Sequence, residues 1–387
     1  MTYQKIEYIE SVALFNEAIA HLQSADSVAF DLEFDSNRYS YGFTLCLIQI
    51  CTRTRCFIID PFKIQNIKPL FEVFENPKIL KIAHSVDQDL RLLHSLKCYP
   101  QEVCDTDIIG KLLNYEVSSL AHFLHEKLQV QMDKKLQASN WTLRPLSEAQ
   151  ILYAAHDVIY LFDLYETLMK EVFQKGIMDW VKDETSAHNE VRFDEQTPNT
   201  DFLSKNDKKD TTEFQQFVLN ELLKFREGFA QKYNKPPYQI IDNQLLREMV
   251  KGEKSFEDWL SYKSIYKAVK NTEIKNAFYN IYTNAIKEAK ALELNMYGKR
   301  RLTPEERAAA AQLLAERDEI KQKLFKPIQS IIIDRYGLFT SRYLLSEGFI
   351  NNVVRQHIKL SELHAPYRRN IILNIAQELD INLSAYW

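Results

Sequence analysis

Two carboxylates inside an apolar strand constrain this chain more than any other feature of its sequence. Residues 27–34 read Ser-Val-Ala-Phe-Asp-Leu-Glu-Phe, which predicts a strand with Asp31 and Glu33 on one face. Like charges on an apolar strand are costly unless a cation offsets them, and carboxylate oxygens are the ligands that Mg²⁺ and Mn²⁺ prefer. Taken alone, the pair fits either a metal site or an edge strand with a solvated face.

Further strands are predicted after this one in the sequence, and the residues that follow them are predicted to be mostly helical. The segments rich in β-favouring side chains are residues 44–51, 56–60 and 78–83. The short connections between the first strands favour an antiparallel meander. The front of the chain is therefore expected to combine a sheet with helices.

Two capping boxes, each a Ser with a Gln three residues on, predict helix starts at Ser85 and Ser147. They place Asp89 in the first turn of one helix and Asp157 about three turns into the other. Tyr153 precedes Asp157 by four residues, so the two share a helix face. Each has a structural explanation when taken alone, because an acid in a first turn complements the helix dipole and a tyrosine hydroxyl can bond a carboxylate.

The ordered set of acids resembles the DEDD exonucleases, which have a ribonuclease H-like fold. The matching text is Phe30-Asp-Leu-Glu-Phe34, His84-Ser-Val-Asp-Gln-Asp-Leu90 and Tyr153-Ala-Ala-His-Asp157. Text similar to ribonuclease D extends over residues 5–175. The resemblance implies an α/β ribonuclease H-like 3′→5′ exonuclease domain, a mixed sheet flanked by helices. A Tyr four residues before the last acid, with Leu five before it, implies the tyrosine branch of that family.

By that resemblance, the acids hold two divalent metal ions, Mg²⁺ or Mn²⁺. Asp31 would bridge the ions, Glu33 and Asp157 would complete the site of one, and Asp89 would support the other. Such a pair of ions stabilises both the attacking and the leaving oxygen at phosphorus. Tyr153 would orient the attacking water, because a free tyrosine pKa near 10 makes it a poor base. The implied activity removes nucleoside 5′-monophosphates from the 3′ end of RNA.

Four further residues are predicted to contact the substrate: Phe34, His84, Trp141 and Arg144. The aromatic rings would stack on the terminal base, and the arginine would meet a phosphate. The phenylalanine equally fits a core position, and the histidine fits a role in positioning a helix start rather than binding metal. Asp87, a helix-dipole partner, and His156, which points off the face shared by the tyrosine and the last acid, are excluded from the site.

The remainder of the chain is predicted to be a linker and two helical domains. The predicted domains are an exonuclease domain at 1–180, a linker at 181–212, an HRDC domain at 213–292 and a second HRDC-like domain at 300–387. The text from Leu222 to Tyr238, with Pro236 and Pro237 in a turn, resembles HRDC modules. Pro304 predicts the start of a helix, capped by Thr303.

Charge is distributed unevenly along the chain. Residues 1–180 carry 17 basic and 24 acidic residues, residues 181–212 carry 5 and 8, and residues 213–387 carry 27 and 21. The positive excess of the rear half is a modest indication of polyanion binding. A helical bundle that only packs against the catalytic domain fits the same excess.

Composition narrows the class of protein further. The chain has 387 residues, 45% of them hydrophobic, and no apolar run approaches the roughly 20 residues that cross a bilayer. Five cysteines without a Cys-x-x-Cys pair, and no signal-peptide pattern, indicate a cytoplasmic protein without a zinc site or disulfide framework. The expected partner is RNA with a single-stranded 3′ end, tRNA precursors by resemblance, and the expected state is a monomer.

Two other functions remain open at the level of sequence. The same fold could degrade DNA from its 3′ end, since the sequence does not reveal recognition of the 2′-hydroxyl. A nucleic-acid-binding scaffold that has lost catalysis would lack one or more acids. All four acids and the tyrosine are present, which argues against the scaffold.

Overall fold

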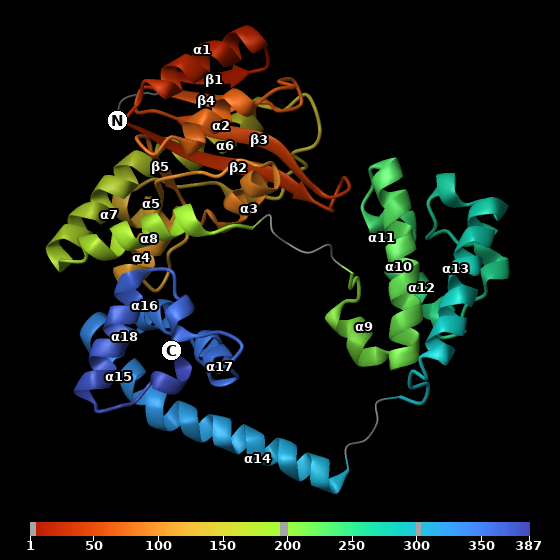
Figure 1. Cartoon of the computed structure of the whole chain (residues 1–387). Helices are drawn as coiled ribbons and strands as arrows, with labels where there is room; N and C mark the ends of the chain where they lie inside the picture. Colours follow the sequence, from red (N-terminus) through yellow and green to blue (C-terminus); the bar gives the residue numbers. More distant parts are fainter. Residues whose placement is uncertain (1–4, 194–199, 299–302) are drawn as a thin grey trace. The chain divides into compact units, whose positions relative to one another are not determined.

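The computed structural model describes residues 5–193, 200–298 and 303–387 (Figure 1). The described residues form two compact units. Unit 1 contains residues 5–33, 45–193 and 306–387, and unit 2 contains residues 34–44, 200–298 and 303–305. The chain therefore leaves unit 1, builds unit 2, and returns to unit 1.

A six-stranded mixed sheet in the order β1-β4-β3-β2-β5-β6 forms the centre of unit 1. The strands are β1 (Lys5–Ile9), β2 (Ser27–Ser36), β3 (Phe43–Cys51), β4 (Arg55–Ile59), β5 (Leu80–Ala83) and β6 (Val103–Asp105). β3 and β4 pair antiparallel, whereas β1 with β4, β2 with β5, and β5 with β6 pair parallel. The predicted mixed sheet is confirmed.

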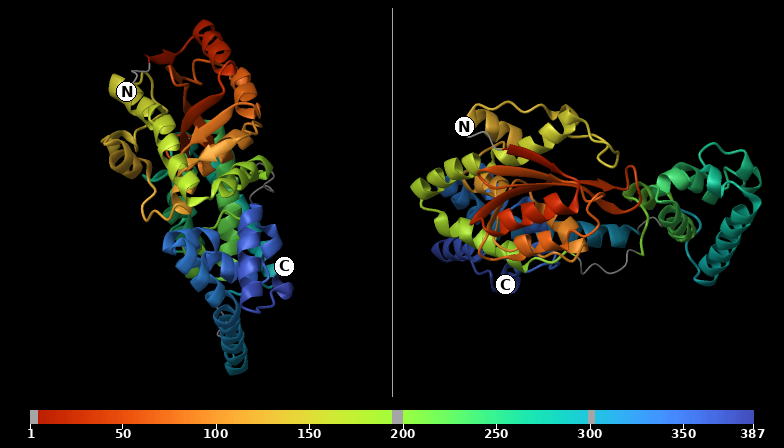
Figure 2. Two further views of the ribbon diagram at one scale, coloured as in Figure 1. Left: turned by 90° about the vertical axis from the view of Figure 1, so that its left-hand side faces the viewer. Right: turned by 90° about the horizontal axis from the view of Figure 1, so that it is seen from above.

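Helices cover both faces of the sheet (Figures 1 and 2). They are α1 (Val12–Gln23), α2 (Lys68–Glu75), α3 (Asp87–Ser95), α4 (Thr106–Leu112), α5 (Leu120–Leu128), α6 (Glu148–Ile159), α7 (Leu161–Lys175) and α8 (Met178–Glu190). Alternation along β2 separates the faces: Phe30 meets Phe74 of α2 with ring centroids 5.0 Å apart. Ala29 instead joins the cluster that contains Ala154 and Val158 of α6.

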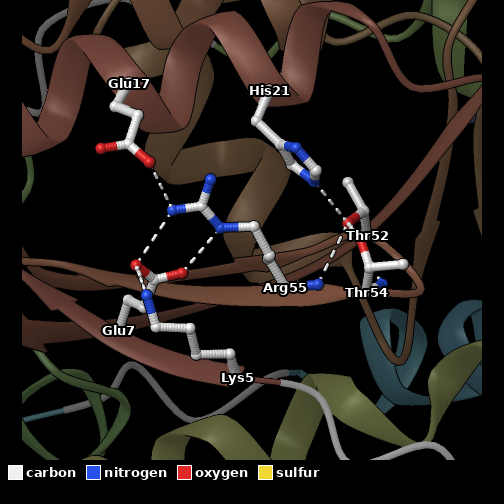
Figure 3. Close-up of polar contacts among 7 residues, drawn as sticks. All are labelled: Lys5, Glu7, Glu17, His21, Thr52, Thr54 and Arg55. Atoms are coloured by element: carbon white, nitrogen blue, oxygen red, sulfur yellow. Dashed lines mark hydrogen bonds and ion pairs between the residues drawn. The ribbon is translucent and has the colours of Figure 1, made fainter.

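An ion-pair cluster joins the outer strands to α1 (Figure 3). Arg55 of β4 donates to Glu7 of β1 through Nε and Nη2 at 2.7 and 2.9 Å, and to Glu17 of α1 at 2.8 Å. The hydrogen bond from Arg55 lowers the pKa of Glu7 to about 2. The parallel β1–β4 edge is therefore fixed by a bidentate contact as well as by its backbone register.

Residues 306–387 share the hydrophobic core of unit 1. Their helices are α14 (Pro304–Ile320), a π-helical turn (Lys321–Phe325), α15 (Lys326–Tyr336), α16 (Leu338–Leu344), α17 (Glu347–Val354) and α18 (Pro366–Glu378), with 3₁₀ turns at Leu360–Glu362 and Ser384–Tyr386. One cluster of buried side chains contains Ile109 and Leu112 of α4 together with Leu344 and Leu345. α14 begins at Pro304, as predicted.

Unit 2 is a small helical bundle. Its helices are α9 (Lys205–Asp210), α10 (Glu213–Tyr233), α11 (Pro237–Ile240), α12 (Asn243–Val250) and α13 (Thr272–Ala291), with 3₁₀ turns at Phe256–Leu260 and Lys267–Val269. Trp259 and Phe278 are buried at its centre. α13 begins only at Thr272, because Asn271 caps it there and Ile265, just before it, forms a β-bridge with Ile241.

The stretch predicted as a linker contains helical residues. α8 continues to Glu190, and α9 occupies Lys205–Asp210 behind a capping box at Ser204. The predicted boundaries of the three domains and of the linker stay a prediction.

All five cysteines are buried, and none of them forms a disulfide. Among the helices of the described residues, none is both long and apolar enough to cross a membrane.

Candidate active site

β2 carries Asp31 and Glu33, whose carboxylates lie beside the carboxylate of Asp157 on α6. One carboxylate oxygen each from Asp31, Glu33 and Asp157 lies within 4.8 Å of the others. Asp31 and Glu33 are two residues apart on β2, so the pleat puts both side chains on the face that α6 covers. This is the only group of that kind found among the described residues that offer His, Cys, Asp or Glu ligands.

α6 carries Tyr153 and Asp157 one turn apart. The predicted capping box starts this helix: the Ser147 hydroxyl accepts from the Gln150 peptide N–H at 3.2 Å, and the Gln150 side chain accepts from the Ser147 N–H at 3.0 Å. Both Tyr153 and Asp157 line the cavity that contains the β2 acids. The predicted i, i+4 relation on one face is therefore present.

Asp89 lies in the first turn of α3, but the predicted cap of that helix is wrong. α3 begins at Asp87 after Val86, and no side chain of its own segment caps it. Ser85 has φ +58°, a left-handed conformation that turns the chain before the helix. The carboxylate of Asp105 takes the place of the expected cap and accepts from the N–H groups of Ser85 and Val86 at 2.8 and 3.0 Å.

Burial raises the pKa of all four acids. The charges of Asp31, Asp157 and Asp89 raise the pKa of Glu33 further, and the charge of Asp31 does the same for Asp89 and Asp157. A hydrogen bond from the Leu32 N–H opposes the shift at Asp31 and Asp89. Four carboxylates in these positions resist being ionised together unless a cation joins them.

A cavity of about 330 Å³ contains the three clustered acids. Its lining residues come from β2, the β5–α3 turn, the start of α5, the segment before α6, and α6 with the start of α7: Phe30, Asp31, Leu32, Glu33, His84, Ser85, Ser119, Leu120, Ala121, Met132, Gln137, Tyr153, Asp157 and Leu161. The donor set is made of carboxylate oxygens, which suits Mg²⁺ or Mn²⁺ rather than a thiolate-loving metal. These residues fit divalent cations.

Burial also raises the pKa of Tyr153, with added contributions from the charges of Asp157, Glu33 and Asp31. Its hydroxyl therefore stays protonated at neutral pH and can act as a hydrogen-bond donor. The ring packs near Trp141, with centroids 6.1 Å apart and planes at 33°.

Two of the predicted substrate contacts are wrong. Trp141 is only 3% exposed and belongs to the hydrophobic core behind Tyr153, so its ring is not open to a base. Arg144 donates to both oxygens of buried Asp60 at 2.5 and 2.9 Å and to three backbone carbonyls. With its five N–H groups engaged, Arg144 is a structural residue and leaves no donor for a phosphate.

The other two predicted contacts lie in different places. His84 lines the cavity, and its Nδ1 bonds the Thr106 hydroxyl at 2.9 Å. Burial lowers the pKa of His84, so the ring is neutral near pH 7. Phe34 falls in unit 2 and packs edge-to-face on Phe43, with centroids 4.9 Å apart. Substrate contact by His84 and Phe34 stays a prediction.

Some residues at the site had no predicted role. Asp105 and Thr106, at the start of α4, hold the turn that leads into α3. Met132 and Gln137 line the cavity from the segment between α5 and α6, which has neither strand nor helix periodicity. The segment Cys104-Asp-Thr106 resembles ribonuclease D sequence, which marks the first pair without assigning either residue a role.

Comparison with known proteins shows what the part of the chain that carries this site is similar to. Residues 6–173 match a family described as 3′-5′ exonuclease. Ribonuclease D of Bartonella henselae is 32% identical over 235 residues, which are 60% of this chain and 57% of that relative. The chain thus spans little more than half the length of this curated relative.

Two further similarities cover more of the chain. Ribonuclease D of Desulfotalea psychrophila is 28% identical over 305 residues, 74% of this chain and 78% of that relative. The crystal structure of Escherichia coli RNase D has the same fold, with a TM-score of 0.67 over 97% of this chain and 99% of that chain, at 21% identity.

Residues 6–173 are thus a 3′→5′ exonuclease domain with a ribonuclease H-like fold. The curated relatives named here are ribonucleases D, so the chain is similar to ribonuclease D-like exonucleases over the residues compared.

Proposed function

We propose that this chain is a metal-dependent 3′→5′ exoribonuclease that shortens RNA from its 3′ end and releases nucleoside 5′-monophosphates. The observation that carries the proposal is the convergence of Asp31, Glu33 and Asp157 within 4.8 Å in a cavity of the exonuclease domain. The residues that would hold two divalent ions are Asp31, Glu33, Asp89 and Asp157. Bound there, the ions would neutralise the charge that develops at phosphorus and lower the pKa of a water.

The side chains of the protein have separate tasks in this proposal. Asp31 and Glu33, fixed by the pleat of β2, define the floor of the site, and Asp157 faces them from α6. Tyr153 holds the attacking water through its protonated hydroxyl, since its raised pKa makes it a donor rather than a base. The cavity walls from β5–α3 and α5 would receive the terminal nucleotide.

RNA is the favoured substrate because the curated relatives at 32% and 28% identity are ribonucleases D. The alternative, a DNA exonuclease of the same fold, has no observation of its own in favour. tRNA precursors, a monomeric state, Mg²⁺ or Mn²⁺ as the ion, and a cytoplasmic location are parts of the proposal that rest on the family resemblance and composition.

Two HRDC-like domains are also proposed, at residues 213–292 and 300–387. Their helical content supports this assignment. α10 of unit 2 lines one groove with Lys224, Phe225, Phe229 and Lys232, cations and rings of the kind that bind single-stranded RNA, and with the acid Glu221.

The test is a timed digestion of 5′-labelled RNA and of the matched DNA, each with Mg²⁺ or Mn²⁺. Stepwise shortening of the RNA with release of 5′-monophosphates is expected. Asp31→Asn should remove the activity. Preferred degradation of DNA, or an active Asp31→Asn variant, would contradict the proposal.

α3 offers a matched pair of variants. Asp89→Asn should lower kcat at least about tenfold, the equivalent of ~1.4 kcal/mol. Asp87→Asn, two residues away, should leave kcat unchanged, because the Asp87 side chain is 62% exposed and pairs with Arg91. Equal losses in both variants would show that Asp89 acts only through its helix.

A further inference from the structure

α4 connects the wall of the candidate active site to residues 326–387. This helix has only seven residues, Thr106–Leu112, and both of its ends are bonded to other segments of unit 1. Its first residues contact the β5–α3 turn, and its last residues contact α16. Contacts that fix one end of α4 can therefore affect the position of its other end.

The first turn of α4 is bonded to a cavity residue. The Thr106 hydroxyl, which is fully buried, donates to the Ala83 carbonyl at 3.0 Å and accepts from His84 Nδ1 at 2.9 Å. His84 lines the cavity next to the acids. A shift of the start of α4 would move His84 with it.

The residue before α4 holds the start of α3. The Asp105 carboxylate caps α4 by accepting from the Asp107 N–H at 2.8 Å. The same carboxylate accepts from Ser85 and Val86 in the turn that leads into α3, whose first turn contains Asp89. One side chain thus fixes α4 and the turn before Asp89 to each other.

The last turn of α4 is capped by α16, and α16 is capped in return. The Thr340 hydroxyl donates to the carbonyls of Lys111 and Leu112 at 3.1 and 3.2 Å. The Asn114 side chain accepts from the N–H groups of Phe339 and Thr340 at 2.8 and 3.2 Å. Helix ends leave unpaired carbonyls and N–H groups, and here each segment satisfies those of the other.

This contact is close enough to exclude a side chain. Gly337, just before α16, has φ +95°, and a Cβ added there would lie 2.2–2.4 Å from the side-chain atoms of Asn114. Thr340 is fully buried. Glycine is therefore required at position 337 both by the backbone conformation and by the approach of Asn114.

A second contact docks the same segment on α8. The Glu184 carboxylate accepts from the hydroxyls of Tyr343 and Tyr367 at 2.9 and 2.5 Å and from Arg368 at 2.8 Å. This network contributes to docking without bonding the backbone of α4. It provides a comparison for variants of the α4–α16 contact.

We propose that residues 326–387 position the cavity wall through α4, with Thr340 and Asn114 as positioning residues for His84, Ser85 and Asp89. The segment then acts as part of the catalytic unit and not only as an attached RNA-binding module. The effect of this contact on catalysis rests on the proposed function. The effect of the same contact on the conformation of the β5–α3 turn is independent of the proposed function.

The experiment is hydrogen exchange, followed by mass spectrometry, on the full chain and three variants. Thr340→Val and Asn114→Ala each remove one side of the reciprocal caps. Peptides covering 84–92 should then exchange at least about tenfold faster, because the N–H groups held by Asp105 open more often. Tyr343→Phe removes one bond of the α8 network and should leave these peptides unchanged.

Three outcomes would overturn the proposal. Faster exchange confined to α16 and the last turn of α4 would show that the contact is local. An equal change in Tyr343→Phe would show that any loosening of the segment has the same effect. Unchanged exchange in both cap variants, with a lowered melting temperature, would leave the segment with a packing role alone.

A second measurement addresses the metal. Thr340→Val and Asn114→Ala should weaken Mn²⁺ binding at least about fivefold by calorimetry, while Tyr343→Phe binds as the wild type does. Absence of RNA degradation by the wild type would refute the proposed function and leave the exchange result valid. Wild-type Mn²⁺ affinity in the cap variants would refute the link to Asp89.

Discussion

At the scale of single residues, the four acids destabilise the fold whenever no cation accompanies them. Burial raises the pKa of Asp31 to about 7 and that of Asp157 to about 8, above the values these groups have in an unfolded chain. A carboxyl group whose pKa is higher in the folded than in the unfolded chain stabilises the fold below its unfolded pKa. This stabilisation is lost as the pH rises through the pKa of the group in the folded chain. The metal-free protein should therefore lose stability between about pH 4 and pH 8.

Asp157→Asn should remove part of that loss. In EDTA we expect the melting temperature of the variant to equal that of the wild type near pH 4 and to exceed it by at least about 3 °C at pH 8.5. With Mn²⁺ the order should reverse, because the ion stabilises only the intact site. Scanning fluorimetry across this pH range checks the prediction, and a pH-independent difference would contradict it.

Arg144 stabilises the fold through its ion pair with the buried Asp60. Arg144→Met should destabilise the protein by roughly 3–5 kcal/mol, because it leaves the buried carboxylate of Asp60 without its partner. Lys182→Met, which breaks an exposed pair with Asp179, serves as the control and should change little. Urea denaturation measures both variants, and a stable Arg144→Met with weakened RNA binding would restore the phosphate role.

The sequence identified the four acids but not the structural roles of Trp141 and Arg144. A carboxylate inside an apolar strand is unusual wherever it folds, so Asp31 and Glu33 could be recognised without a structure. Trp141 and Arg144 could not, because their roles depend on Tyr153 and on Asp60, 84 residues away in the chain. Proximity in sequence to the Tyr-bearing helix suggested a site contact that tertiary packing does not make.

At the scale of elements, the two predicted capping boxes differ in outcome. Ser147→Ala should cost about 1 kcal/mol, because it removes a capping bond of α6. Ser85→Gly should leave stability unchanged or raise it, since Ser85 caps nothing and has φ +58°, which glycine adopts freely. Thermal unfolding of both variants checks this contrast, and a loss in Ser85→Gly equal to that in Ser147→Ala would contradict it.

The predicted strands agree with the observed ones where the apolar segment of the sequence is long. β2, β3 and β4 begin or end within one or two residues of their predicted bounds. β1 and β6 received no prediction: β1 reads Lys-Ile-Glu-Tyr-Ile, and β6 has three residues. Such edge strands are defined by their pairing with β4 and β5 rather than by their own periodicity.

At the scale of the whole molecule, each unit has its own core, and each should unfold separately. Trp259 lies in the core of unit 2, whereas Trp141, Trp180 and Trp387 belong to unit 1. Urea titration followed by tryptophan fluorescence should show two transitions, and Trp259→Phe should remove the amplitude of one. Trp387→Phe should reduce the amplitude of the other. A single transition in every variant would show that the units unfold cooperatively.

The sequence predicted a helix start at Pro304 and a helical domain after it, but not the partner against which these helices pack. The sequence order suggested three domains in a row. The shared cluster of Leu112 with Leu344 and Leu345 instead joins the last segment to the first unit. Side chains so distant in the chain carry no local signal of their contact.

The return of residues 306–387 to unit 1 has a consequence for synthesis on the ribosome. The strands and helices through α8 emerge first, yet the caps that α16 supplies to α4 are made only after about 150 more residues have followed. At ~5–20 residues per second, this leaves a delay of roughly 7–30 s. A nascent chain would thus expose its acid-bearing sheet before α16 caps the last turn of α4, so the proposed bracing of the cavity wall can form only after residues 338–344 have been synthesised.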